Sequence, residues 1–147
     1  MKDKIAIAAD HGGFELKQFL ISSLENAGYE IVDLGADKYE SADDFPDYAA
    51  KMAAAIQAGE VEKGVLICGT GIGMSMAANR HPHIRAALVH DGFTARTCRE
   101  HNDANVLVLG GRILGPELAL DCAKIFLATE FLGGKYQCRN DKMNESC

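Results

Sequence analysis

The chain has 147 residues, a length typical of one domain, and 48% of its residues are hydrophobic and 24% charged. This composition excludes a disordered or fibrous chain. Because 15 basic residues stand against 21 acidic ones, the formal net charge is −6, and a protein that binds nucleic acid is not expected.

Five short runs rich in β-branched and apolar residues predict strands, at residues 4–9, 29–33, 64–68, 85–89 and 106–110. Apolar residues at helical spacing lie between or after them, at residues 16–27, 46–58, 72–79, 93–101 and 118–129. This alternation predicts a single-domain, doubly wound, parallel five-stranded sheet with helices on both faces, a Rossmann-like α/β fold. Residues from about 130 onward carry no strand signal and form a basic C-terminal tail, which we expect to fold back over the site.

Sheets of this kind bind ligands outside the carboxyl ends of their strands. The residues that directly follow four of the predicted strands are unusually polar and rich in glycine, at 10–13, 68–73, 90–92 and 110–112. We therefore expect the functional residues at this edge of the sheet.

The loop after the third predicted strand carries Gly69, Gly71 and Gly73. Closely spaced glycines before a helix let backbone N–H groups converge on one anion. A dinucleotide fingerprint fits less well, because Met74 occupies its third glycine position and the loop does not follow the first strand, although Asp91 lies at a suitable distance. A dinucleotide-binding module and a turn without a ligand both remain open.

Cys68 lies at the mouth of this loop, where the start of a helix favours the thiolate, so it is a candidate base or nucleophile. A buried structural role is the alternative, and it is the one we expect for Cys98 and Cys122. Cys138 and Cys147 are expected to be surface thiols. An odd number of cysteines without a CxxC pair predicts neither a disulfide framework nor a zinc site, and it fits a reducing cytoplasm.

Other polar residues allow two interpretations each. Asp10 and His11 offer hydrogen bonds and a proton carrier. The acidic run from Glu40 to Asp47 is most simply a solvated loop and helix start, and it does not predict a metal site. His101 and Asn102 at a predicted helix end serve equally well as helix caps or as site residues.

The sequence motifs that stand out lie at 10–13 (DHGG), 68–73 (CGTGIG), 99–105 (REHNDAN), 111–112 (GR) and 133–134 (GG), the last followed by Arg139. In this order they resemble type B ribose-5-phosphate isomerases, whose family includes the galactose-6-phosphate isomerase subunits. The resemblance covers nearly the whole chain. It implies metal-independent interconversion of ribose 5-phosphate and ribulose 5-phosphate through a cis-enediolate, without a cofactor, as in the pentose phosphate pathway.

The resemblance also implies a homodimer whose sites lie at the subunit interface, with the tail contributing to the site or to the dimer. An isomerase of a six-carbon sugar phosphate, such as allose 6-phosphate or galactose 6-phosphate, is an alternative. A non-catalytic module that binds a nucleotide or sugar phosphate is another.

By the same resemblance, Cys68 is the base that moves a proton between C2 and C1, and His101 is the acid that opens the furanose ring. The anion hole for the enediolate consists of Gly69, Thr70, Gly71, Ile72 and Gly73. Asp10 and Asn102 contact the sugar oxygens. The phosphate is bound by His11, Arg112, Lys135 and Arg139.

The chain departs from the usual pattern of these isomerases at two positions. Lys135 stands where an arginine is more frequent, which replaces a bidentate donor by a point charge. Phe45 stands where a tyrosine is usual, which removes a hydroxyl group. A second branch of the family has a glutamate at the position of Met74, so Cys68 places this chain with the cysteine branch.

The apolar run at residues 5–9 is too short for the core of a signal peptide. No stretch approaches the roughly 18 apolar residues of a membrane helix. We therefore expect a cytoplasmic protein without a membrane partner.

Overall fold

The computed structural model describes residues 3–145, and its centre is a five-stranded sheet with the strand order β2-β1-β3-β5-β4. All neighbouring strands are parallel. The strands are β1 (Lys4–Ala9), β2 (Glu30–Asp33), β3 (Lys63–Cys68), β4 (Ala86–Leu88) and β5 (Val106–Gly110). Each begins and ends within one residue of its predicted bounds, and the predicted fold is confirmed.

Six α-helices and one short 3-10 helix complete the described part of the chain. They are η1 (His11–Gly13), α1 (Phe14–Asn26), α2 (Phe45–Gln57), α3 (Ile72–Ala78), α4 (Gly92–Glu100), α5 (Pro116–Ala128) and α6 (Lys135–Asn144). The sequence pattern did not predict α6, because only Asn140 of its residues is buried and no apolar stripe marks a face. The available signal was weak, because only half of the residues of α6 are good helix formers: Lys135, Gln137, Arg139, Lys142 and Met143.

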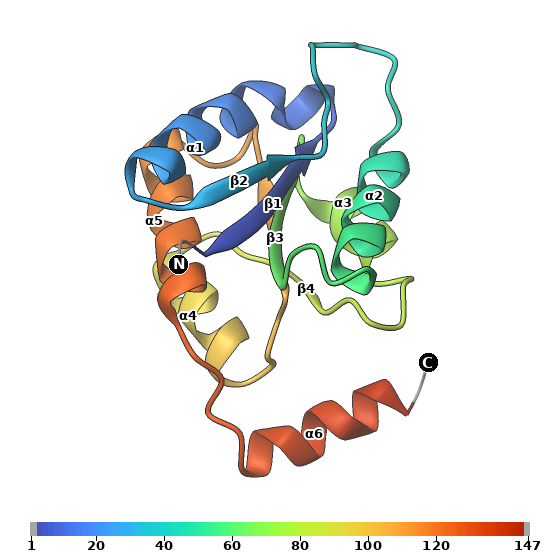
Figure 1. The fold of residues 1–147 in the computed structure, drawn as a ribbon, viewed down its shortest axis with the longest axis vertical. Helices are drawn as coiled ribbons and strands as arrows, with labels where there is room; N and C mark the ends of the chain where they lie inside the picture. The colour runs from blue at the N-terminus through green and yellow to red at the C-terminus, as the bar shows by residue number, and fades with distance from the viewer. Residues whose placement is uncertain (1–2, 146–147) are drawn as a thin grey trace.

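The helices cover both faces of the sheet (Figure 1). Side chains of a strand point alternately to the two faces, so each strand contributes to two cores. On one face, α1, α4 and α5 pack against the sheet, with Leu20 and Phe126 fully buried beside Ile7. On the other face, α2 and α3 bury Met52 and Met74 against Leu66.

Three loops at the carboxyl edge of the sheet pack backbone against backbone. A Cβ atom added to Gly12, after β1, would lie 2.7 Å from the backbone nitrogen of Gly69, after β3. A Cβ atom on Gly111, after β5, would lie 2.5 Å from the carbonyl oxygen of Gly12. The N–H of Gly111 also donates to the carbonyl of Cys68 at 2.8 Å. The loops after β1, β3 and β5 thus form one packed unit.

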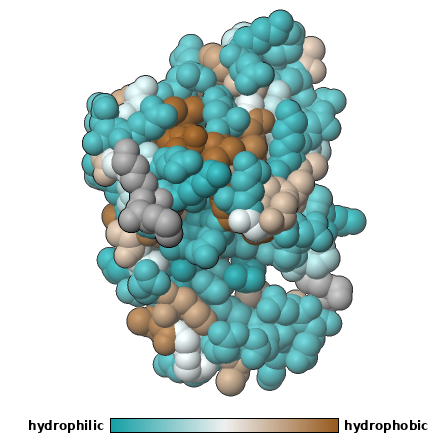
Figure 2. Space-filling view, in the orientation of Figure 1, coloured by the Kyte–Doolittle hydropathy of each residue, from teal (hydrophilic) through white to brown (hydrophobic). Residues whose placement is uncertain are grey.

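Helix α6 stands apart from the layers of the fold, at the end of the molecule away from the carboxyl edge of the sheet (Figure 1). An extended segment joins it to α5. Hydrogen bonds hold this segment to the end of α4: Leu132 N–H donates to the carbonyl of Glu100, and Arg99 Nε donates to that of Thr129. Figure 2 shows a mostly hydrophilic face, with a hydrophobic patch over β1 and β2. None of the helices at residues 3–145 has the length and apolar character needed to cross a membrane.

The packing of the three loops predicts that Gly12→Ala destabilises the protein. The added methyl group meets backbone atoms of Gly69, which cannot rotate away, so we expect a loss of about 1 to 3 kcal/mol in the free energy of unfolding. Urea denaturation measures it. The control is Gly115→Ala, because Gly115 has a φ of −65° and no atom within 4 Å of an added Cβ. Equal stability of Gly12→Ala and the wild-type protein would contradict the packing argument.

Candidate functional site

Cys68 ends β3 at the point where the strand order reverses, between β1 and β3. Its side chain is 5% exposed, and the N–H of Gly71 donates to its Sγ at 3.2 Å. Gly71 has a φ of +81°, in the left-handed region, and a Cβ atom there would collide with Leu88. The backbone donor holds the sulfur of Cys68 at the mouth of the loop, at the edge of the sheet where ligands bind.

Some N–H groups of the glycine-rich loop form hydrogen bonds to other residues of the same loop. Gly71 donates to Cys68, and the N–H of Ile72 donates to Thr70 Oγ1 at 3.2 Å. The loop therefore does not present a continuous row of free donors, as the glycine spacing alone suggested. Phe45 of α2 covers its far end, since a Cβ atom on Gly73 would lie 2.8 Å from the Phe45 ring.

Asp10 follows β1 and lies beside this loop, 6% exposed. Its Oδ1 accepts the N–H of Gly12 at 2.9 Å and so begins η1. Burial raises the pKa of Asp10 above its usual range, although the hydrogen bond from Gly12 and the charge of His11 oppose this change. A buried carboxyl group at a sheet edge is suited to bind hydroxyl groups of a ligand.

His11 is held by a carboxylate that sequence reasoning assigned to a solvated loop. Asp43 Oδ1 accepts the backbone N–H of His11 at 3.0 Å and lies 2.7 Å from its Nδ1. Tyr48 donates its hydroxyl group to Asp43 Oδ2 at 3.1 Å. The acidic run before α2 was visible in the sequence, but the contact of Asp43 with a loop 32 residues earlier was not.

Arg112 completes the cluster at the carboxyl edge. Its N–H donates to the carbonyl of Gly69 at 2.9 Å, and its guanidinium group lies over the same residue, with Nη1 3.2 Å from the position of a Cβ atom. The fold thus brings Asp10, His11, Cys68 and Arg112 together at one edge, as predicted. A cation, a partly exposed imidazole and a set of backbone donors there favour an anionic ligand.

The remaining predicted site residues form a second cluster on α6 and at the end of α4. His101 stacks on Tyr136, with ring centroids 4.4 Å apart and planes 9° apart. Lys135 and Arg139 lie over the same tyrosine ring, at 5.3 and 5.7 Å from its centroid. Asn102 is exposed beside them. Tyr136 organises this cluster, and no motif in the sequence marks it.

The two clusters lie at opposite edges of the sheet. Cys68 pairs with Gly110 at the end of β5, whereas Gly64 pairs with Val106 at its start. Because α4 runs back along the sheet, His101 belongs to the edge where β5 begins, about 13 Å of strand away from Cys68. Within one chain, the tail forms α6 beside His101 and not beside Cys68, and its contribution to a complete site or to a dimer stays a prediction.

Among residues 3–145, one group of side chains has the spacing of a metal site: Asp10, His11 and Asp43, whose ligand atoms lie within 4.8 Å of one another. The hydrogen bond between His11 and Asp43 already joins two of the three. Asp91, the acidic residue that a dinucleotide site requires, caps α4 by accepting the N–H of Thr94 at 2.7 Å. Capping of α4 therefore accounts for Asp91 without a dinucleotide.

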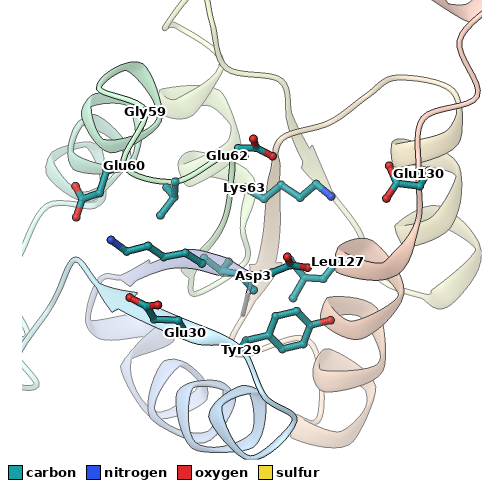
Figure 3. A pocket seen from close by; sticks show the side chains of 12 residues that line it. Asp3, Tyr29, Glu30, Gly59, Glu60, Glu62, Lys63, Leu127 and Glu130 are labelled. Atoms are coloured by element: carbon teal, nitrogen blue, oxygen red, sulfur yellow. The ribbon is translucent and has the colours of Figure 1, made fainter. Parts of the chain in front are cut away.

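A cavity of about 590 Å³ opens at the edge where the strands begin, far from Cys68. Five carboxylate side chains and two lysines line it, and Figure 3 shows Asp3, Glu30 and Glu60 among them. Its excess of negative charge disfavours an anionic substrate. A second cavity, of about 390 Å³, lies beside Asn102 between the end of α6 and β4.

Comparisons with known proteins show what this chain is similar to. Residues 5–143 match the model of the Ribose/Galactose Isomerase family. Ribose-5-phosphate isomerase B of Escherichia coli is 43% identical over 136 residues, which are 92% of this chain and 91% of that protein. The Clostridium thermocellum ribose-5-phosphate isomerase B structure has a TM-score of 0.95, with 47% identity over 97% of this chain and 96% of its own.

A further solved structure carries a ligand. It is ribose-5-phosphate isomerase B of Mycoplasma genitalium with bound ribulose 5-phosphate. Its TM-score is 0.93, and its sequence is 37% identical over 99% of this chain and 97% of its own.

Proposed function

The chain belongs to the ribose/galactose isomerase family, and from that membership we infer that it interconverts ribose 5-phosphate and ribulose 5-phosphate. The observation that carries this inference is Cys68, a buried thiol with a backbone donor on its sulfur, at the switch point of the sheet and next to Asp10. The Mycoplasma genitalium neighbour with bound ribulose 5-phosphate favours this five-carbon substrate over six-carbon sugar phosphates.

The proposed chemistry is a proton transfer between adjacent carbons. His101 protonates the ring oxygen of the furanose as the bond from that oxygen to C1 breaks, and the anomeric hydroxyl group gives its proton to solvent, so the chain opens to the aldehyde. The Cys68 thiolate then removes the proton from C2. The electron pair of that C–H bond forms the C1–C2 double bond while the carbonyl pair moves onto O1, which gives the cis-enediolate. The proton of the C2 hydroxyl group passes to O1, the C2 carbonyl forms, and the Cys68 thiol returns its proton to C1. A carbon acid needs both a positioned base and a stabilised enediolate. The loop from Gly69 to Gly73 provides the donors for the enediolate oxygen.

The remaining residues bind the substrate in this proposal. Asp10 and Asn102 contact the sugar oxygens. The phosphate group is bound by His11, Arg112, Lys135 and Arg139. Lys135 contributes charge without the two parallel hydrogen bonds of an arginine, so it is the weakest member of this set.

Cys68→Ala should remove turnover while leaving substrate affinity nearly unchanged, because a base acts on the transition state more than on the bound ground state. We expect kcat to fall at least about 100-fold, the usual contribution of a general base. Steady-state kinetics with ribose 5-phosphate, together with binding of inorganic phosphate, measures both quantities. Turnover near the wild-type rate would contradict the assignment.

Alkylation of the protein provides an internal control for this assignment. Cys98 and Cys122 are buried as expected, and burial raises the pKa of Cys98 to about 11, so neither should react. Cys138 is exposed, as expected, and Cys147 lies outside the described residues. In a Cys138→Ser variant, inactivation should follow modification of Cys68 and be slowed by saturating substrate.

We also propose that the active protein is a homodimer, in which the cluster around His101 of one copy meets the Cys68 edge of the other. The separation of the two clusters by about 13 Å of strand supports this proposal. The carboxyl edge also carries four apolar side chains that are more than half exposed: Ile72, Met76, Phe93 and Ile113. Apolar side chains gathered around a polar site are typical of a surface that another chain covers.

Mixing two inactive variants tests the shared site. In a dimer of one Cys68→Ala chain and one His101→Asn chain, one of the two sites combines an intact Cys68 with an intact His101. After unfolding and joint refolding, we expect about a quarter of the wild-type rate from ribose 5-phosphate, because half of the dimers are mixed. No recovery above the separate variants would show that both residues act within one chain.

The proposed reaction requires no metal ion, and we expect the protein to work in the cytoplasm, where Cys68 stays reduced. Dialysis against a chelator should therefore leave kcat and KM for ribose 5-phosphate unchanged. The grouping of Asp10, His11 and Asp43 makes this measurement informative, since these residues have the spacing to hold a cation. Loss of activity that a divalent ion restores would contradict metal independence.

A further inference from the structure

We propose that Asp43 is a positioning residue, which fixes the ring of His11 so that its Nε2 faces the phosphate group of the substrate. The inference rests on the proposed function, because it takes His11 as a phosphate ligand. Asp43 lies in the segment before α2, 32 residues along the chain from His11, and the bond between them joins this segment to the loop after β1.

One carboxylate oxygen fixes both the main chain and the side chain of His11. Asp43 Oδ1 accepts the backbone N–H at 3.0 Å and lies 2.7 Å from Nδ1. Because a carboxylate can only accept a hydrogen bond, Nδ1 must carry a proton. Nε2 is then the ring nitrogen that remains for a ligand. The second bond, from the main chain of His11, holds the Asp43 oxygen in place, so the ring is bonded to a fixed acceptor.

Asp43 is itself held in place. Its side chain is 10% exposed, and its other oxygen accepts the hydroxyl group of Tyr48. Burial alone would raise the pKa of Asp43, but the hydrogen bonds from His11 and Tyr48 outweigh burial and lower it. Asp43 is therefore a carboxylate under ordinary conditions. With Nδ1 bonded to Asp43, the donor that the protonated ring has left for a phosphate oxygen is Nε2–H.

The position of the negative charge suits this role. A carboxylate close to a phosphate would weaken its binding, but Asp43 lies behind the ring, bonded to Nδ1, and acts through it. The arrangement resembles the support of a metal-bound histidine by a carboxylate on its second nitrogen, with a phosphate in place of the metal.

Two variants separate the roles of the acceptor and of the charge. Asp43→Ala removes both, and we expect the Kd of inorganic phosphate and the KM of ribose 5-phosphate to rise about tenfold, with a much smaller change in kcat. Asp43→Asn retains an oxygen that can accept from Nδ1, so it should restore part of the affinity. Asp44→Ala is the matched control, because Asp44 is an exposed neighbour in the same acidic run, and it should bind phosphate as the wild-type protein does.

Nitrogen-15 spectra of the His11 ring give a readout that a general loss of stability does not move. In the wild-type protein above neutral pH, Nδ1 should carry the proton, and in Asp43→Ala the proton should shift to Nε2. The double variant His11→Ala/Asp43→Ala should bind phosphate no more weakly than His11→Ala alone, because Asp43 acts only through His11.

An unchanged ring tautomer in Asp43→Ala would overturn the proposal, as would a further tenfold loss of phosphate affinity in the double variant. Both readouts are made without turnover. Failure of this inference is therefore distinguishable from failure of the proposed function, which an absence of ribose 5-phosphate turnover in the wild-type protein would reveal.

Discussion

The close approach of three backbone segments at the carboxyl edge of the sheet determines the geometry of the site. Gly12, Gly69 and Gly111 let the loops after β1, β3 and β5 touch without intervening side chains. Main-chain hydrogen bonds from Gly111 and Arg112 to the end of β3 and its loop then fix their relative positions. Because the loops pack as one unit, the backbone segments that carry Asp10, Cys68 and Arg112 have little freedom to move relative to one another. A rigid scaffold of this kind is what proton transfer between adjacent carbons requires.

The winding of the fold explains why one chain holds only part of the proposed machinery. A helix that follows a parallel strand runs back along the sheet, so its last residues lie at the opposite edge from the strand end. His101 at the end of α4 obeys this rule, and α6 joins it there through the stacking of Tyr136. The proposed dimer is the simplest way to bring these residues to Cys68. In that arrangement, the cations of Lys135 and Arg139 would add to Arg112 in binding a phosphate group.

The sequence predicted the strands and the loops well, because short apolar runs and glycine clusters are local signals. It did not predict α6, whose residues are mostly polar and lack an apolar stripe. Asp43 was also missed: an acidic run before a helix is usually solvated, and only the folded chain brings this carboxylate to His11. The separation of His101 from Cys68 could have been derived from the direction of the predicted helix at 93–101. The order of the motifs along the chain does not show this separation, because residues of one site can come from two copies of the chain.

A crystal structure of the protein with ribulose 5-phosphate bound would test the shared site. We expect C1 and C2 of the sugar at about 3 to 3.5 Å from Cys68 Sγ, the separation of a reactive complex. We also expect the phosphate group at His11 Nε2 and Arg112, and His101 supplied by a second copy of the chain. A sugar phosphate bound away from Cys68, or a site completed by His101 of the same chain, would contradict this expectation.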